Sequence, residues 1–319
     1  MNIIETHALS RVYGKRRAVD SLDMCVAAGE IYGFVGKNGA GKSTAMKMIA
    51  GLVRPTSGSV ELFGAQRRAR EGFSRVGALI EDPGILPTFS ALENLMCKAL
   101  ALGVVRPNAH CRELLELVGL ADTGSLRVKK FSLGMKQRLG LALALVGGPD
   151  LLLLDEPFNG LDPESTRAMR GALVRLNRER GVTIVISSHV LDQLDRMATS
   201  FGVIRSGRMV RELSMDDLHR ECGNSIRIRT NDPARTLAIL EEALPGTALR
   251  AEPDGSILAS AAVRHAAMSF GGAAVAPMAP SPEDVARALS EHGLLILELS
   301  HVERDIEEYF VELMGGPDA

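Results

Sequence analysis

The sequence predicts an α/β fold whose core is a parallel sheet, and two observations indicate it. First, a glycine-rich loop, Gly36–Thr44, lies between a short apolar strand and a segment of helical spacing, Ser43–Leu52. Second, two apolar strands, Leu151–Leu154 and Val182–Ile186, are separated by a predicted helix at Pro163–Arg178. Because apolar strands that alternate with helices pair in parallel and are buried on both faces, these segments are expected to share one sheet.

Short strand-like runs alternate with turns at the start of the chain, for example Ile3–Thr6 and Leu22–Val26. This pattern predicts a small β layer ahead of the glycine-rich loop. Tyr13 lies in this region and is one of only three tyrosines in a chain without tryptophan. It is a candidate platform for stacking an adenine ring, and packing on the sheet is the alternative for a strand aromatic.

The glycine-rich loop has the form G-x-x-x-x-G-K-[ST] and is predicted to bind nucleotide phosphates. Its glycines let the backbone wrap an anion, with N–H groups directed at the β-phosphate. Lys42 is expected to reach the β- and γ-phosphates, and the Ser43 hydroxyl to ligate Mg²⁺. A chance glycine-rich turn is the alternative, and the strand and helix on either side argue against it. The predicted nucleotide-binding residues of the loop are Gly36, Asn38, Gly39, Ala40, Gly41, Lys42, Ser43 and Thr44.

A strand-rich passage follows the loop and ends in Val76–Ile80, directly before Glu81. Helical periodicity then takes over, with glycines as stops, in the segments Ala91–Leu102, Ala109–Val118 and Leu133–Val146. We therefore expect a helical insert, at about residues 85–145, between the phosphate loop and the next strand.

Polar residues follow both apolar strands of the predicted core. Asp155 and Glu156 come after the run of four leucines, and His189 follows the next strand. Beside a phosphate loop, Asp155 would hold Mg²⁺ through its water, and Glu156 would polarise the water that attacks the γ-phosphate. An acidic pair at a strand end is usually solvated surface, but the apolar strand and the loop upstream favour the chemical role.

Together these segments resemble the ATP-binding subunit of an ABC transporter over about the first 215 residues. The family's signature motif, usually written LSGGQ, is matched by Phe131–Arg138, in which Ser132 and Gly134 agree with the consensus and three other positions depart. A hydroxyl and a glycine N–H at a helix N-terminus can bind an anion, although an ordinary helix cap would also explain Ser132. The resemblance implies a P-loop NTPase fold of ABC ATPase type, with a parallel core sheet, an N-terminal antiparallel β layer and an α-helical insert.

The resemblance also implies a role for individual residues. The signature motif would face the γ-phosphate bound by a second copy of the chain, so that two copies form an ATP-sandwich dimer. Asp162 matches the D-loop along that dimer interface, His189 matches the switch histidine that contacts the γ-phosphate, and Tyr13 occupies the adenine-stacking position.

Glu81 departs from the family pattern, because a glutamine that contacts Mg²⁺ and the attacking water normally stands there. A carboxylate is a harder, charged oxygen ligand, so it should hold Mg²⁺ more tightly or require the cation before ATP can approach. The predicted metal ligands are therefore Ser43, Glu81 and Asp155. Glu81 and the sequence FSLGMKQR resemble the bacitracin-resistance and lantibiotic-immunity branch of the family.

After Leu218 the motifs stop, and we expect a small α+β accessory domain at 219–319, following the ATP-binding domain at 1–218. It contains no catalytic constellation, and its closing stretch resembles the ending of the same antibiotic-export branch, which implies dimer support or regulation. Ala262–Pro280 is rich in Ala, Gly and Pro and expected to be partly irregular. The predicted strands are Ser225–Thr230, Ala248–Ala251, Ser256–Ala261 and Leu294–Leu297, and the predicted helices are Pro233–Leu244, a helix opened by Ser281, and Ile306–Met314.

Length, charge and cysteine content limit the classes of protein that this chain can be. Its 319 residues allow two domains, and its net charge of -2 provides no global basic field for nucleic acid or anionic lipid. Any membrane attachment must therefore be local. Cys25, Cys97, Cys111 and Cys222 form no C-x-x-C pair and are expected to be reduced, small buried hydrophobes. No secretion signal is expected, and the richest apolar run, Leu139–Val146, is too short to cross a bilayer.

The resulting hypothesis is an ATPase that uses ATP and Mg²⁺ to energise a separately encoded transmembrane permease and to export a peptide antibiotic or similar compound. Its expected place is the cytoplasm, peripheral on the inner face of the cell membrane through the permease, with no nucleic-acid partner. The alternative is a soluble ABC ATPase that acts on ribosomes or nucleic acid. A single cassette without a long coiled coil or a basic tail counts against this alternative.

Overall fold

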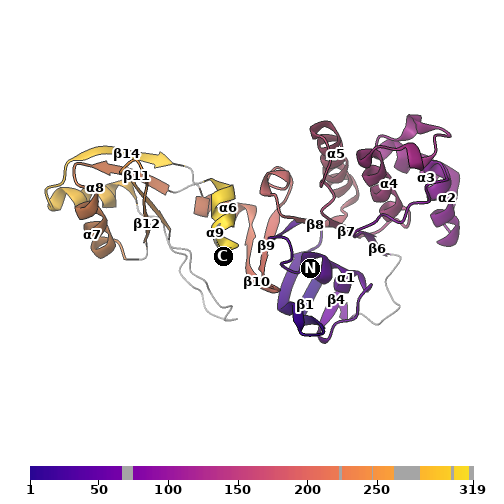
Figure 1. Cartoon of the computed structure of the whole chain (residues 1–319), viewed down its shortest axis with the longest axis horizontal. Coiled ribbons are helices and arrows are strands. Elements are labelled where there is room, and N and C mark those ends of the chain that lie inside the picture. The colour runs from indigo at the N-terminus through magenta and orange to yellow at the C-terminus, as the bar shows by residue number, and fades with distance from the viewer. Residues whose placement is uncertain (67–74, 223–224, 246, 262–280, 303–304, 316–319) are drawn as a thin grey trace. The chain divides into compact units, whose positions relative to one another are not determined.

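The computed structural model describes residues 1–66, 75–222, 225–245, 247–261, 281–302 and 305–315 (Figure 1). The chain divides into two compact units, Met1–Glu212 and Leu213–Ala319. Each unit has its own sheets and its own apolar cluster, and each is described by itself.

The first unit begins with an antiparallel layer in the strand order β2-β1-β4-β5. The sequence predicted short separate runs here, whereas the structure contains two strands of 12 residues each that pair as a long hairpin. Register shifts around Ala8, whose φ of 46° is left-handed, interrupt the alternation of buried and exposed residues and explain the difference. The strands of this layer are β1 (Asn2–Tyr13), β2 (Arg16–Ala27), β4 (Ser57–Leu62) and β5 (Ala65–Gln66).

The core of the first unit is a six-stranded sheet in the order β10-β9-β3-β8-β7-β6. The pairs β3·β8, β3·β9, β7·β8 and β6·β7 are parallel, which confirms the predicted fold class. Strands β9 and β10 were not predicted from the sequence, and the mostly half-buried residues of β10 give no clean alternation. The strands are β3 (Ile31–Val35), β6 (Val76–Leu79), β7 (Leu151–Asp155), β8 (Thr183–Ser188), β9 (Ser200–Arg205) and β10 (Arg208–Ser214).

The α-helices of the first unit agree with the predicted segments to within two residues at both ends. Ser90 begins α2 with a capping box that includes Glu93, and Asp162 caps α5. Helices α2, α3 and α4 contact one another, so the predicted insert is a helical layer (Figure 1). The helices are α1 (Lys42–Ala50), α2 (Ala91–Ala101), α3 (Pro107–Leu117), α4 (Leu133–Leu145) and α5 (Pro163–Arg180).

The second unit contains a four-stranded antiparallel sheet in the order β12-β13-β11-β14. Ile226, Leu240 and Leu289 are fully buried in its apolar cluster. The predicted last strand is wrong in its bounds, because Leu295 and Leu297 are exposed and β14 continues to Val302. The passage 262–280 lies outside the described residues. The elements are α6 (Met215–Cys222), β11 (Ser225–Thr230), α7 (Pro233–Ala243), β12 (Thr247–Ala251), β13 (Ile257–Ala261), α8 (Pro282–Glu291), β14 (Ile296–Val302) and α9 (Ile306–Leu313).

The four cysteines are all free thiols, and two of them contradict their predicted burial. Cys111 and Cys222 are buried as expected, whereas Cys25 and Cys97 are exposed. Cys25 lies on the outward side of β2, between inward-facing residues, because successive side chains of a strand point to opposite faces. Among the described residues, no helix is both long enough and apolar enough to cross a membrane.

Candidate nucleotide-binding site

The glycine-rich loop connects the end of β3 to the start of α1. All five residues of β3 are buried, so the loop is anchored in the centre of the parallel sheet. Gly39 and Gly41 have φ of 82° and 113°, in the left-handed region. A Cβ at Gly36 would lie 2.6 Å from the carbonyl oxygen of Ile204, and one at Gly41 would lie 2.5 Å from that of Ala18. The tight loop therefore requires glycine at these positions.

A hollow of about 430 Å³ opens beside the loop, which is within the usual size range of small-ligand sites. It brings the loop together with Glu156 from the end of β7 and with Tyr13 from the end of β1. Sequence reasoning did not single out Arg16 or Ala18, which belong to the β1–β2 hairpin that forms one wall. The hollow is lined by Tyr13, Arg16, Ala18, Asn38, Gly39, Gly41, Lys42, Ser43, Thr44 and Glu156.

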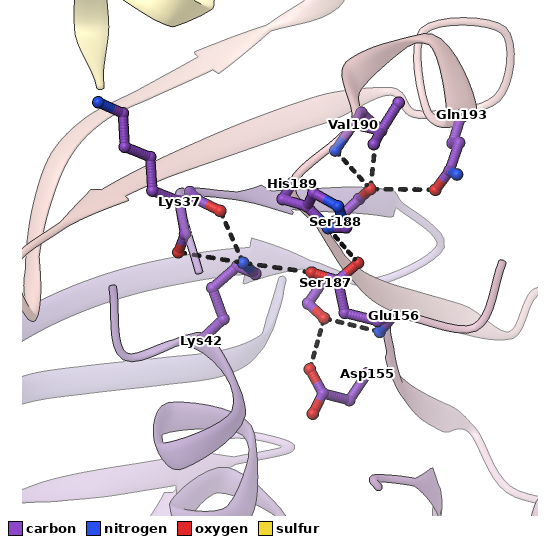
Figure 2. Close-up of polar contacts among 10 residues, drawn as sticks. Lys37, Lys42, Asp155, Glu156, Ser187, Ser188, His189, Val190 and Gln193 are labelled. Carbon is purple, nitrogen blue, oxygen red and sulfur yellow. Dashed lines mark hydrogen bonds and ion pairs between the residues drawn. The ribbon is translucent and has the colours of Figure 1, made fainter. Parts of the chain in front are cut away.

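Lys42 is the first residue of α1 and is only 5% exposed. Its Nζ donates a hydrogen bond of 2.6 Å to the carbonyl oxygen of Gly36 and lies 3.2 Å from Oε1 of Glu156 (Figure 2). A buried ammonium group is costly unless it is paired, and here the loop backbone and a carboxylate pair it. The loop therefore encloses a positive charge that can also interact with a bound anion.

Glu156 connects the ends of two neighbouring strands. It follows β7 with a left-handed φ of 48°, and its Oε2 lies 2.8 Å from Nδ1 of His189 (Figure 2). An ionised carboxylate can only accept a hydrogen bond, so Nδ1 is the protonated nitrogen in this contact. The structure thus brings three predicted catalytic residues together, because Lys42 and His189 both contact the carboxylate of Glu156.

Ser187 holds the acidic pair in place, and sequence reasoning did not single it out. It lies opposite Asp155 in the parallel ladder of β7 and β8. Its Oγ donates a hydrogen bond of 2.6 Å to Oδ1 of Asp155 and accepts one of 2.9 Å from the backbone N–H of Glu156 (Figure 2). A polar residue that ends an apolar strand was the available signal.

Glu81 follows β6 and has a left-handed φ of 61°. Its Oε1 lies 2.5 Å from Nζ of Lys47, a residue of α1 that sequence reasoning did not consider. Glu81 is absent from the described residues that line the hollow. The structure therefore places this predicted metal ligand against α1 rather than inside the loop.

Tyr13 is the last residue of β1 and is 44% exposed. Its ring lines the hollow, and the guanidinium of Arg11 lies 4.5 Å from the ring centre. An exposed ring at the mouth of the hollow differs from an aromatic residue packed into the sheet. A cation on one face leaves the ring able to stack a planar group, as aromatic side chains commonly do.

The remaining predicted residues have local structural partners within the chain. Ser132 caps α4, with its Oγ accepting from the N–H of Met135, and a Cβ on Gly134 would lie 2.8 Å from Oγ of Ser165. Asp162 caps α5 by accepting from the N–H of Ser165, and this hydrogen bond lowers the pKa of Asp162. None of these three residues is among the described residues that line the hollow.

Comparison with known proteins links this site to one family. The family described as ABC transporter matches residues 19–159. The chain is 36% identical over 316 residues to the bacitracin transport ATP-binding protein BcrA of Bacillus licheniformis, covering 98% of each protein. It is 39% identical over 214 residues to the lantibiotic transport ATP-binding protein SrtF of Streptococcus pyogenes, covering 67% of this chain and 92% of that protein.

Solved structures share the same architecture. The dimeric post-hydrolysis state of the ATP-binding cassette MJ0796, bound to ADP and Pi, aligns with a TM-score of 0.61 at 22% identity, covering 66% of this chain and 98% of that chain. An ATP-binding subunit of an ABC transporter aligns with the same TM-score at 30% identity, covering 68% and 92%. The first likeness supports the fold alone.

Proposed function

We propose a function for this chain on the ground that it belongs to the ATP-binding proteins of ABC transporters. It binds ATP with Mg²⁺ at the Gly36–Thr44 loop, and it uses ATP hydrolysis to energise a separate membrane permease. The observation that carries the proposal is the buried Lys42. Its ammonium group faces a glycine-lined loop and a carboxylate inside a hollow of about 430 Å³.

The residues at the loop fit the nucleotide and the cation. Lys42 would exchange its contact with Glu156 for the phosphates, while the loop N–H groups bind the same oxygens. The Ser43 hydroxyl and the Asp155 carboxylate would hold Mg²⁺, because this cation prefers oxygen ligands. When bound, Mg²⁺ would neutralise charge on the phosphates. Ser187 keeps the Asp155 carboxylate in place for that role.

Glu156 is proposed as the general base. Once Lys42 pairs with a phosphate, Oε1 of Glu156 is left without its nearby cation and can accept a proton from the attacking water. His189 holds the other carboxylate oxygen and is proposed to contact the γ-phosphate. The two side chains therefore orient each other at the end of the parallel strands.

Tyr13 is proposed to stack on the adenine ring. Tyr13→Ala should weaken ATP binding by about tenfold, because stacking of a base on an aromatic side chain contributes roughly 1–3 kcal/mol. Tyr13→Phe keeps the ring and should bind as the wild type does. Equal ATP affinity of the Ala and Phe variants, measured by calorimetry, would contradict this role.

A second copy of the chain is proposed to complete the site. The hydroxyl of Ser132 and the backbone of Gly134 would contact the γ-phosphate held by the partner subunit, and Asp162 would lie along the interface. These residues do not line the hollow of their own chain, as such a role requires.

The transported compound is proposed from the names of the relatives. BcrA is a bacitracin transport protein, SrtF is a lantibiotic transport protein, and DrrA of Streptomyces peucetius, 33% identical over 98% of this chain, is a daunorubicin/doxorubicin resistance protein. We place this subunit at the inner face of the cell membrane, bound to its permease, where it drives export of a peptide antibiotic or similar compound.

The test is purification of the tagged chain from membranes, followed by identification of what binds to it. We expect an integral membrane protein in a fixed ratio, both with the wild type and with Lys42→Ala, while only the wild type restores antibiotic resistance to a strain that lacks the gene. Recovery with ribosomes, or resistance that survives Lys42→Ala, would contradict the proposal.

A further inference from the structure

Three carboxylates gather at one edge of the parallel sheet. β6 and β7 are neighbouring parallel strands with Leu79 opposite Leu154, so the residues after them leave the sheet at the same edge. Glu81 comes after β6, Asp155 is the last residue of β7, and Glu156 follows β7. A polyanionic nucleotide must approach the same edge, so each carboxylate there needs a partner that limits repulsion.

Each of the three carboxylates has a different partner. Ser187 donates to Asp155, and the two lysines of α1 pair with the two glutamates. Lys42 lies 3.2 Å from Glu156, and Lys47 lies 2.5 Å from Glu81. Helix α1 therefore supplies one cation for each glutamate at this edge.

The contact with Lys47 places Glu81 close to the proposed cation site. Lys47 lies four residues after Ser43, so both side chains occupy the same face of α1, about 6 Å apart along the axis. Lys47, the partner of Glu81, therefore lies one helical turn from the residue whose hydroxyl is proposed to ligate Mg²⁺.

The Lys47–Glu81 pair is open enough to exchange. The side chain of Lys47 is 25% exposed and that of Glu81 is 64% exposed. An ion pair this accessible contributes only about 0.2–1 kcal/mol, because water screens it. Lys42, by contrast, is buried and also bonded to the loop backbone. The ion pair of Lys47 is therefore screened by water and easily exchanged, whereas that of Lys42 is buried.

We propose that Lys47 is a positioning residue that competes with the divalent cation for the Glu81 carboxylate. The inference rests on the proposed function, since it assumes that a nucleotide and Mg²⁺ bind at the loop. Without nucleotide, Lys47 neutralises Glu81 and lets ATP approach an edge that would otherwise repel it. When the cation is present, Glu81 exchanges Lys47 for it. A neutral glutamine at position 81 would need no such counter-ion.

The test is the ratio of ATP affinity with Mg²⁺ to that in chelator, measured by calorimetry on the full-length chain. Lys47→Met should raise this ratio about fivefold, because an unpaired Glu81 repels metal-free ATP and is fully available to the cation. Lys47→Arg keeps the charge and should restore the wild-type ratio. In a Glu81→Gln background, Lys47→Met should change the ratio by less than about twofold, since the carboxylate is gone.

Lys98→Met is the matched control. Like Lys47, Lys98 is a half-buried lysine in the last turn of a helix, but it has no carboxylate partner among the described residues. It should leave the ratio unchanged, which separates the ion pair from the loss of a cation near a helix C-terminus. Thermal denaturation checks that each variant is folded. If Lys47→Met does not fold, Lys47→Gln removes the same charge with a polar side chain and should raise the ratio by a similar factor.

Two outcomes would overturn the inference: an unchanged ratio in Lys47→Met, or an equal change in the presence and absence of the Glu81 carboxylate. Failure of the proposed function gives a different result, because the wild type would then show no Mg²⁺-dependent ATP binding and Lys42→Ala would not alter its affinity.

Discussion

The two units bury different kinds of polar side chain. The first unit buries charged groups, among them Lys42 and Asp20, beside the hydroxyls of Ser187 and Ser188. Charged groups are rarely buried unless they are paired or take part in binding or catalysis. Their presence therefore indicates that the binding and catalytic residues lie in the first unit. In the described part of the second unit, the buried polar residues carry hydroxyls only: Ser225, Thr230, Thr236, Ser256 and Ser260.

The two sheets explain this difference. In the first unit, the carboxyl ends of parallel strands meet at one edge, so Asp155, Ser187 and their neighbours converge there. In the second unit, the antiparallel strands β12, β13, β11 and β14 end alternately at opposite edges. A parallel sheet thus concentrates the polar residues at the carboxyl ends of its strands at one edge, whereas an antiparallel sheet distributes them over two edges.

The largest expected difference between the units is in how ATP turnover responds to the loss of one cationic side chain. Lys42→Ala should lower ATP turnover by about 10²-fold or more, because it removes the cation that faces the phosphates. Arg250→Ala in the second unit, which removes ion pairs with Glu252, Glu308 and Glu312, should leave turnover unchanged. A phosphate-release assay on both variants decides the point, and comparable losses would remove the distinction.

Glu156→Gln should lower turnover by about 10²- to 10⁴-fold, because an amide cannot act as the general base. ATP should still bind, since the loop and Lys42 remain, and a dimer should accumulate that light scattering detects. Adding Ser132→Ala should weaken that dimer. A Glu156→Gln variant that stays monomeric with saturating ATP would contradict the two-copy site.

Core truncation tests whether the units are energetically separate. Leu240→Ala empties a fully buried position of the second unit and should cost roughly 2–5 kcal/mol of its stability while turnover is retained. Leu153→Ala in β7 should cost a similar amount in the first unit and also lower turnover, because β7 positions Asp155. Denaturant unfolding and turnover are measured together, and loss of turnover with Leu240→Ala would show that the units are coupled.

The smallest expected effect is a pH dependence within the first unit. The hydroxyl of Tyr32 donates a hydrogen bond of 2.5 Å to Oε1 of Glu212. Burial raises the pKa of the Glu212 carboxyl above its usual value. A raised carboxyl pKa favours the protonated form in the fold, so its stabilising contribution is present below the unfolded pKa and is lost as pH rises through the folded pKa. The melting temperature of Glu212→Gln should therefore rise relative to that of the wild type as the pH increases from about 4 towards neutral. A difference in melting temperature between the two proteins that does not change with pH would contradict this role of Glu212.

Much of the first unit could be predicted because its signals are local. The turn requirements of Gly39 and Gly41, the spacing of α1 and the apolar run of β7 are all properties of short segments. Wrong or missed features had weaker local signals. Cys25 was expected to be buried because of its type, but the pleat of β2 turns it outward.

The sequence by itself determined the phosphate loop, the alternation of strands and helices, and the residues that follow each core strand, because these depend on neighbours along the chain. Only the tertiary structure decided which of those residues meet. The order β3-β8-β7-β6 brings Ser187 to Asp155 and Glu156 to Lys42. It also sets Glu81 against Lys47, a pair separated by 34 positions that no local pattern reveals. Contacts of this kind arise from strand order and register, which long-range packing selects.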